Sequence, residues 1–179
     1  MTVPADNLTS LTATGNALVL AGVSWPVEAQ LLDDWLKGHR AHHPDPDVEV
    51  LHLPTGNPPS GILTRLVEQL EADDDRSVVP VRVFWMPDAK HSRRSRIAAL
   101  LSGRDPYRPR QKQQRRILDQ DPSRARVVAG ESARIAELRQ QWRDTTVGGD
   151  AHDFARFVIR RAILAIERVE YRLLGPEYK

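Results

Sequence analysis

Three histidines and two aspartates between residues 39 and 47 are side chains that could hold a metal ion or transfer a proton. They are His39, His42, His43, Asp45 and Asp47. Imidazole nitrogens and carboxylate oxygens form a donor set that zinc and related divalent ions accept. However, the adjacent His42 and His43 rarely point in the same direction, and the two prolines of this stretch are typical of an exposed turn. We therefore predict neither a metal site nor a cofactor.

His42 and Asp47 also have the His-x-x-x-x-Asp spacing by which some acyltransferases orient a catalytic histidine with a carboxylate. The residues between them, His-Pro-Asp-Pro, predict a loop with no following helix to hold the pair, so we interpret the spacing as a coincidence. The sequence contains neither a Gly-x-Gly-x-x-Gly phosphate turn nor a Gly-x-Ser-x-Gly nucleophile elbow. It therefore predicts no catalytic residue.

The third chemical signal is a basic segment within a chain whose net charge is only +2. Residues 1–89 hold 5 Lys/Arg against 13 Asp/Glu, whereas residues 90–126 hold 12 against 3. Most of these cations are arginines, which bind phosphate or carboxylate in a bidentate manner. The segment is either a solvated surface that pairs with the acidic first half, or a contact for lipid headgroups, a phosphorylated metabolite or nucleic acid. Its candidate contacts are Arg93, Arg94, Arg96, Arg104, Arg108, Arg110, Arg115 and Arg116.

The elements that would position these side chains alternate between strand and helix. Short apolar runs predict strands over residues 17–23, 48–53, 78–85 and 125–129. Helical spacing predicts helices over residues 27–37, 61–72, 96–101, 111–119 and 132–142, with Gly38 ending the first. This alternation predicts an α/β fold with a small, mostly parallel sheet of about four strands flanked by helices. Pro80 predicts that its strand lies at a sheet edge or begins there.

A long amphipathic helix is predicted over residues 151–174. Outside its apolar stripe lie three further candidate anion or membrane contacts, Arg156, Arg160 and Arg161. The stripe either packs on the sheet or a further domain, or lies on an anionic membrane surface. The longest apolar run, residues 17–23, is too short to span a bilayer. The absence of cysteine excludes disulfides and thiolate metal sites and is consistent with a reducing cytoplasm.

Several blocks together resemble the N-terminal region of bacterial membrane-associated glycerol-3-phosphate acyltransferases, in the style of actinobacterial members. The blocks are Val-Pro-Val-Arg-Val-Phe-Trp at 79–85, Gly-Arg-Asp-Pro at 103–106, Arg-Ala-Arg-Val-Val-Ala-Gly-Glu at 124–131, and the Arg-rich closing helix through Leu-Gly-Pro-Glu-Tyr-Lys at 174–179. They occur in the order of the family, and the resemblance covers about residues 48–179.

The resemblance implies transfer of an acyl group from acyl-CoA or acyl carrier protein to the sn-1 hydroxyl of glycerol 3-phosphate, at the cytoplasmic face of the membrane. In that family a separate downstream domain carries the catalytic His-x-x-x-x-Asp motif, so no catalytic residue is carried over to this chain. We therefore expect a noncatalytic N-terminal portion that is peripheral at the membrane. Its expected partners are the acyltransferase domain and an anionic membrane surface, with acyl donors bound only through the parent enzyme.

On this interpretation residues 1–16 are a flexible arm, 17–142 an α/β domain, 143–150 a linker, and 151–179 a helix leading towards an absent catalytic domain. The alternative is a stand-alone α/β module that binds a polyanion or nucleic acid. Nucleic acid is the less favoured partner, because Tyr107 is the one aromatic residue within the basic segment and stacking platforms for bases are lacking.

Overall fold

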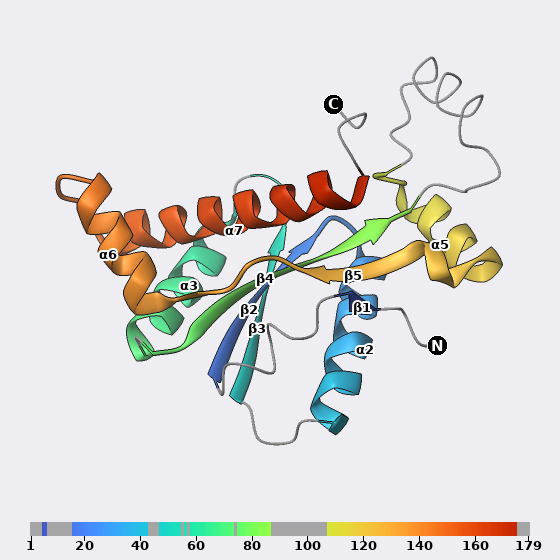
Figure 1. Cartoon of the computed structure of the whole chain (residues 1–179), viewed down its shortest axis with the longest axis horizontal. Helices are drawn as coiled ribbons and strands as arrows, with labels where there is room; N and C mark the ends of the chain where they lie inside the picture. The colour runs from blue at the N-terminus through green and yellow to red at the C-terminus, as the bar shows by residue number, and fades with distance from the viewer. Residues whose placement is uncertain are drawn as a thin grey trace, which may run out of the picture.

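A mixed β-sheet forms the centre of the molecule (Figure 1). The structure, a computed structural model, describes residues 5–6, 16–42, 47–54, 56, 58–73, 75–86 and 107–174. The strands are β1 (Ala5–Asp6), β2 (Asn16–Val23), β3 (Asp47–Pro54), β4 (Ser77–Trp85), β5 (Ala125–Ala129) and β6 (Ala133–Arg134). The helices are α2 (Pro26–His42), α3 (Ser60–Ala72), α5 (Gln111–Gln120), the short 3-10 helix η2 (Pro122–Arg124), α6 (Ile135–Thr145) and α7 (Ala151–Leu174). The expected α/β fold with a long C-terminal helix is confirmed, whereas the helix expected over 96–101 lies outside the described residues.

The strand order is β1-β5-β4-β2-β3, with β6 paired to β4 beyond the end of β5. β2 is parallel to β3 and to β4, but β5 is antiparallel to β4. The expectation of a mostly parallel sheet is therefore wrong at its fourth predicted strand. The Met86 N–H donates to the Arg124 carbonyl oxygen at 2.7 Å, so the chain re-enters the sheet beside the end of β4 that it has just left. An antiparallel strand follows from that point of re-entry.

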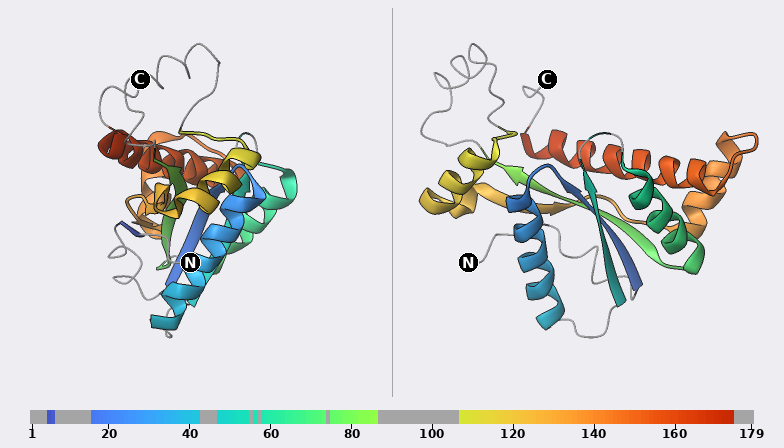
Figure 2. Two further views of the ribbon diagram at one scale, coloured as in Figure 1. Left: turned by 90° about the vertical axis from the view of Figure 1, so that its right-hand side faces the viewer. Right: turned by 180° about the vertical axis from the view of Figure 1, so that it is seen from behind.

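Helices cover both faces of the sheet, as the views in Figure 2 show. On one face, α2 and α5 pack on Val79, Val81 and Val83 of β4. On the other face, α3, α6 and α7 pack on the alternate residues of the strands, including Val78 and Phe84 of β4. The apolar stripe of α7 therefore lies on the sheet, as one of the two interpretations of the sequence expected.

Pro80 occupies an unexpected place, because β4 is a central strand rather than an edge strand. One side of β4 pairs with β2, in register at Leu20 and Pro80. On the other side the Pro80 carbonyl oxygen accepts the Gly130 N–H at 2.8 Å, between the end of β5 and the start of β6. The N–H and C=O of one strand residue point to the same side, so the donor that proline lacks falls in this gap of the ladder.

Gly130 brings α7 close to the sheet at the same gap. A Cβ atom there would lie 3.0 Å from Pro80 Cγ and 3.2 Å from the backbone carbonyl carbon of Ala165 in α7. We expect Gly130→Ala to lower the free energy of unfolding by about 1–2 kcal/mol, since the core must expand to admit the methyl group. Urea denaturation followed by circular dichroism measures the change.

Gly38→Ala is the matched control for this substitution. Gly38 lies inside α2, which continues to His42 rather than ending at Gly38 as expected, and no atom beyond the backbone of its own helix lies within 4 Å of the position that a Cβ would occupy. Alanine is therefore expected to raise the free energy of unfolding there by about 0.5–1 kcal/mol. A Gly130→Ala protein as stable as the original would contradict the close approach of α7.

The short strand β1 and the segment before α7 are also tied to this core. Ala5 and Asp6 pair in parallel with Val127 and Val128 of β5, and the rest of residues 1–15 lies outside the described part of the chain. α6 continues to Thr145, so residues 146–150 connect it to α7. The Asp150 carboxylate accepts the Asp153 N–H at 2.9 Å and caps α7. This backbone hydrogen bond, above all, holds the pKa of Asp150 below its ordinary value.

Candidate anion-binding surface

Seven of the arginines that the sequence singles out lie within the described part of the chain. Arg93, Arg94, Arg96 and Arg104 lie outside the described residues. Arg108 and Arg110 precede α5, Arg115 and Arg116 lie exposed on α5, and Arg156, Arg160 and Arg161 belong to α7. Four of the seven described arginines therefore lie in or just before α5, and three lie on α7.

The outer face of α7, turned away from the sheet, combines cationic and apolar side chains. Ile163, Leu164 and Tyr171 expose 49%, 47% and 49% of their surfaces there. Their exposed cationic neighbours on the helix are Arg156, Arg160, Arg168 and Arg172. We call these seven residues the α7 outer face.

Two arginines of this face are partly neutralised by carboxylates. Arg156 pairs with Asp153 at 3.0 Å, and Arg168 pairs with Glu131 at 3.8 Å. Arg160 has no ion pair or hydrogen bond with any residue that the structure describes. The four arginines outnumber Asp153, Glu131 and the exposed Glu167 of the same helix, so the face keeps a small positive charge.

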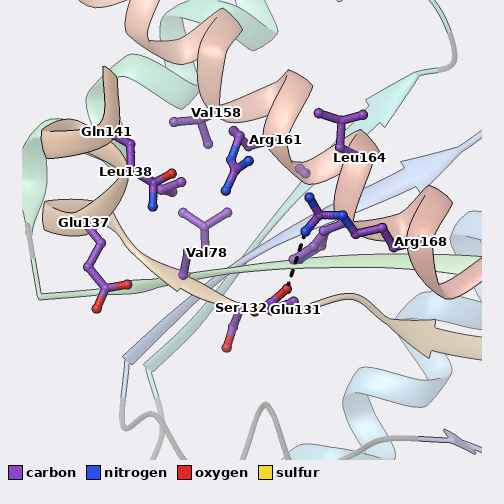
Figure 3. A pocket seen from close by; sticks show the side chains of 14 residues that line it. Val78, Glu131, Ser132, Glu137, Leu138, Gln141, Val158, Arg161, Leu164 and Arg168 are labelled. Carbon is purple, nitrogen blue, oxygen red and sulfur yellow. Dashed lines mark ion pairs between the residues drawn. The ribbon is translucent and has the colours of Figure 1, made fainter. Parts of the chain in front are cut away.

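Arg161 is directed elsewhere than Arg156 and Arg160. It reaches from α7 into a cavity of about 210 Å³ that α6 and residues 131–133 close from the other side (Figure 3). Glu131, Ser132 and Gln141 contribute polar groups to this cavity. The helix expected from residue 132 begins only at Ile135, so the residues after Gly130 line a cavity instead of forming the start of α6.

Trp25, an aromatic residue that the sequence did not identify as a candidate contact, lies beside the described part of the basic segment. Trp25, 40% exposed, lines a shallow groove of about 440 Å³ together with Arg110 and Lys112 at the start of α5. Trp25 follows β2, and the basic segment follows β4. The carboxyl ends of parallel strands meet at one edge of a sheet, so this topological signal could have predicted their proximity.

Glu28 forms a buried polar cluster behind Trp25. Its Oε1 accepts hydrogen bonds from Trp85 Nε1 at 3.0 Å and from Gln114 Nε2 at 2.8 Å, while Oε2 accepts the Ser24 N–H at 2.7 Å. The carboxylate thus links α2, β4 and α5, and it also occupies the N-terminal turn of α2. In many α/β proteins that position binds a phosphate, and here a side chain of the protein already supplies the negative charge.

Of the histidines and aspartates of residues 39–47, His39 is the one whose side chain falls within the described part of the chain. His39 is buried in α2, where its ring stacks on Trp35 with centroids 6.2 Å apart. His42 is the last residue of α2 and Asp47 the first of β3, whereas residues 43–46 lie outside the described part. Among the residues described, no group of three His, Asp or Glu side chains is placed to hold a metal ion.

Neither a membrane-spanning helix in the described residues nor a match to a family model or a solved structure indicates what this surface does. No helix within the described ranges is both long enough and apolar enough to cross a membrane. No protein-family model matches the chain, and no solved structure matches it. Any function must therefore follow from the residues and their arrangement.

Proposed function

We propose that this chain is the noncatalytic α/β portion of a glycerol-3-phosphate acyltransferase, and that it rests on the anionic cytoplasmic face of the cell membrane. The sequence blocks at 79–85, 103–106, 124–131 and 174–179 motivate the choice of enzyme. The α7 outer face is the observation that carries the membrane contact.

An anionic bilayer is the surface that such a face fits best. Ile163, Leu164 and Tyr171 offer apolar and aromatic area to the headgroup region, and the arginines around them attract anionic lipids. The opposite side of the helix packs on the sheet, so α7 is held with this face outward. The domain then approaches the membrane as a rigid body, without inserting a helix across it.

The noncatalytic role is supported by the positions of His42 and Asp47. Both lie at the amino end of β3, where α2 ends and the strand begins. Ligands of open α/β sheets bind at the carboxyl ends of the strands, which is the opposite edge. The His-x-x-x-x-Asp spacing of this chain is therefore not at the edge where an acyltransferase site would be expected in this fold.

We expect Arg160→Glu to weaken binding to phosphatidylcholine vesicles containing phosphatidylglycerol by about ten-fold, because a cation near an anionic surface contributes about 1 kcal/mol and its reversal adds repulsion. Cosedimentation with anionic and with purely phosphatidylcholine vesicles, at low and at high salt, measures the effect. Arg143→Glu is the matched control, since it reverses one exposed charge on α6 away from the α7 outer face.

Absence of binding under all four conditions, or equal loss in the Arg160 and Arg143 variants, would remove the membrane role. The noncatalytic role is tested separately by assaying acyl transfer from acyl-CoA to glycerol 3-phosphate with this chain alone. Turnover that disappears in His42→Ala would contradict it, whatever the vesicles show.

Binding of a single-stranded nucleic acid is the second candidate, and Trp25 is the observation that favours it. Its exposed ring beside Arg110 and Lys112 provides the aromatic surface that the basic segment itself lacks. A labelled oligonucleotide titrated at the same two salt concentrations distinguishes the candidates. A salt-sensitive shift that Trp25→Ala abolishes would favour nucleic acid, and a flat titration at low salt would exclude it.

A further inference from the structure

A crevice opens at the carboxyl ends of β2 and β3, beneath α7. β3 is added on one side of β2 and β4 on the other, so the strand order reverses at β2. In open α/β sheets such a reversal leaves a crevice outside the strand ends, and ligands bind there. The topology therefore marks this place before any side chain is considered.

The walls of the crevice are mostly apolar. It contains a cavity of about 210 Å³ that is partly open to solvent, with Leu53 and Pro54 at the end of β3 on one side. Ile159, Ile163 and Ile166 of α7 form the other side. Water occupies about 30 Å³ per molecule in the liquid, so the cavity has room for about seven groups of that size.

Arg82 places a positive charge in this apolar setting. Its Cγ and Cδ atoms pass 3.8 Å from the position that a Cβ of Gly22 would occupy, so its stem lies over the last residues of β2. The side chain is half-buried and makes no hydrogen bond or ion pair with any residue in the described part of the chain. Arg82 lines both the 210 Å³ cavity and an adjoining one of about 40 Å³.

The other charged groups around Arg82 are of both signs. Arg108 also lines both cavities, and Glu167 lies exposed at the rim of the larger one. Glu170, only 6% exposed, and Glu28 line the smaller cavity, where the Glu28 carboxylate is already bound by three donors. Glu167 and Glu170 oppose accumulation of negative charge, so a monoanion is favoured over a dianion.

We propose that the crevice binds a small aliphatic monoanion, with its anionic group on Arg82 and its alkyl body between the end of β3 and α7. An apolar cavity with a few polar or charged groups is the usual form of a small-molecule site. The guanidinium fork suits a carboxylate or a phosphate ester equally in geometry, and the neighbouring carboxylates favour the former. The proposal does not require the membrane role, because it rests on Arg82 and the crevice walls, and it shares only Ile163, at the rim, with the α7 outer face.

Hexanoate is the probe that fits the size of the cavity, and isothermal titration calorimetry of the whole chain measures its binding. We expect saturable binding that weakens at least about ten-fold in Arg82→Gln, since hydrogen bonds to a charged group contribute about 1.5–3 kcal/mol. Arg143→Gln, on the exposed surface of α6, should bind hexanoate as the original protein does. Circular dichroism checks that both variants are folded.

A ligand series on the unchanged protein keeps the test decisive if Arg82→Gln does not fold. Hexanol lacks the charge and propionate lacks most of the alkyl body, so each should bind at least about ten-fold more weakly than hexanoate. Hexyl phosphate distinguishes the two anionic groups, with weaker binding than hexanoate expected. Hexanol binding as tightly as hexanoate, undiminished hexanoate binding in Arg82→Gln, or no saturable hexanoate binding would each overturn the proposal.

Discussion

We expect Glu28→Ala to lower the free energy of unfolding by about 3 kcal/mol, because its carboxylate is the shared acceptor of three donors from different elements. Trp85 Nε1 and Gln114 Nε2 are buried, and each unsatisfied donor costs about 1–3 kcal/mol. Relief of the desolvation of the carboxylate offsets part of this loss. Urea denaturation at neutral pH measures the change.

Glu28→Gln separates the hydrogen bonds from the packing of the side chain. The amide oxygen still accepts from Trp85 and Gln114, whereas the NH2 group faces the Ser24 N–H, so we expect a loss of about 1–2 kcal/mol. Asp34→Ala removes an exposed carboxylate of the same helix, paired with Lys37 at 3.5 Å, and should change stability by less than about 1 kcal/mol. Equal losses in the Glu28→Ala and Asp34→Ala variants would show that the buried cluster contributes nothing specific.

Phe154→Ala has the second large effect that we expect, a loss of about 4 kcal/mol, which is typical of a truncated core phenylalanine. Phe154 is 2% exposed, and its ring lies 5.4 Å from that of Trp142 in α6. The Arg139 guanidinium stands 4.7 Å from the centre of the Phe154 ring and also donates to the Leu70 carbonyl oxygen at the end of α3. One ring thus joins α3, α6 and α7, and its loss leaves a cavity where the three helices meet.

Tyr171→Ala provides the comparison on the same helix. Tyr171 is aromatic but exposes about half of its surface, so its removal should change the unfolding free energy by about 0.5 kcal/mol or less. Thermal unfolding followed by circular dichroism ranks the two variants. If the Phe154→Ala and Tyr171→Ala proteins unfold at the same temperature, the packing of α6 on α7 does not depend on the Phe154 contact.

The element types were largely predictable from apolar spacing, but the direction of β5 was not. Five apolar residues at 125–129 carry no information on strand direction, which depends on where the preceding segment returns to the sheet. The prediction that the helix ends at Gly38 was wrong because tertiary packing, which the local sequence does not show, extends α2 to His42. Leu36 and His39 are buried on either side of Gly38, so packing against the core outweighs the cost of a helical glycine, about 1 kcal/mol.

The candidate sites were less predictable than the fold, because they depend on which helix covers each face of the sheet and on which strand ends lie side by side. Arg82 alternates with valines in β4, a pattern that suggests an ordinary solvent-facing side chain, but α7 covers that face. Trp25 and Arg108 are remote in sequence and meet only because β2 and β4 are parallel. Conversely, helical spacing alone located Arg156 and Arg160 on the polar side of α7, and the structure agrees.

The contact between Met86 and Arg124 has a consequence for how the length of the chain between β4 and β5 can vary in evolution. The Met86 N–H donates to the Arg124 carbonyl oxygen, and Arg124 Nε donates to the Met86 carbonyl oxygen at 2.8 Å. These two bonds fasten the ends of the long excursion at the border of the sheet. Doubling the length of a chain between two fixed points costs only about 0.6 kcal/mol of closure entropy. Insertions and deletions within α5 still cost stability, because its Gln114 is bound in the buried Glu28 cluster, whereas the two bonds hold β4 and β5 in register whatever the length of the rest of the connection.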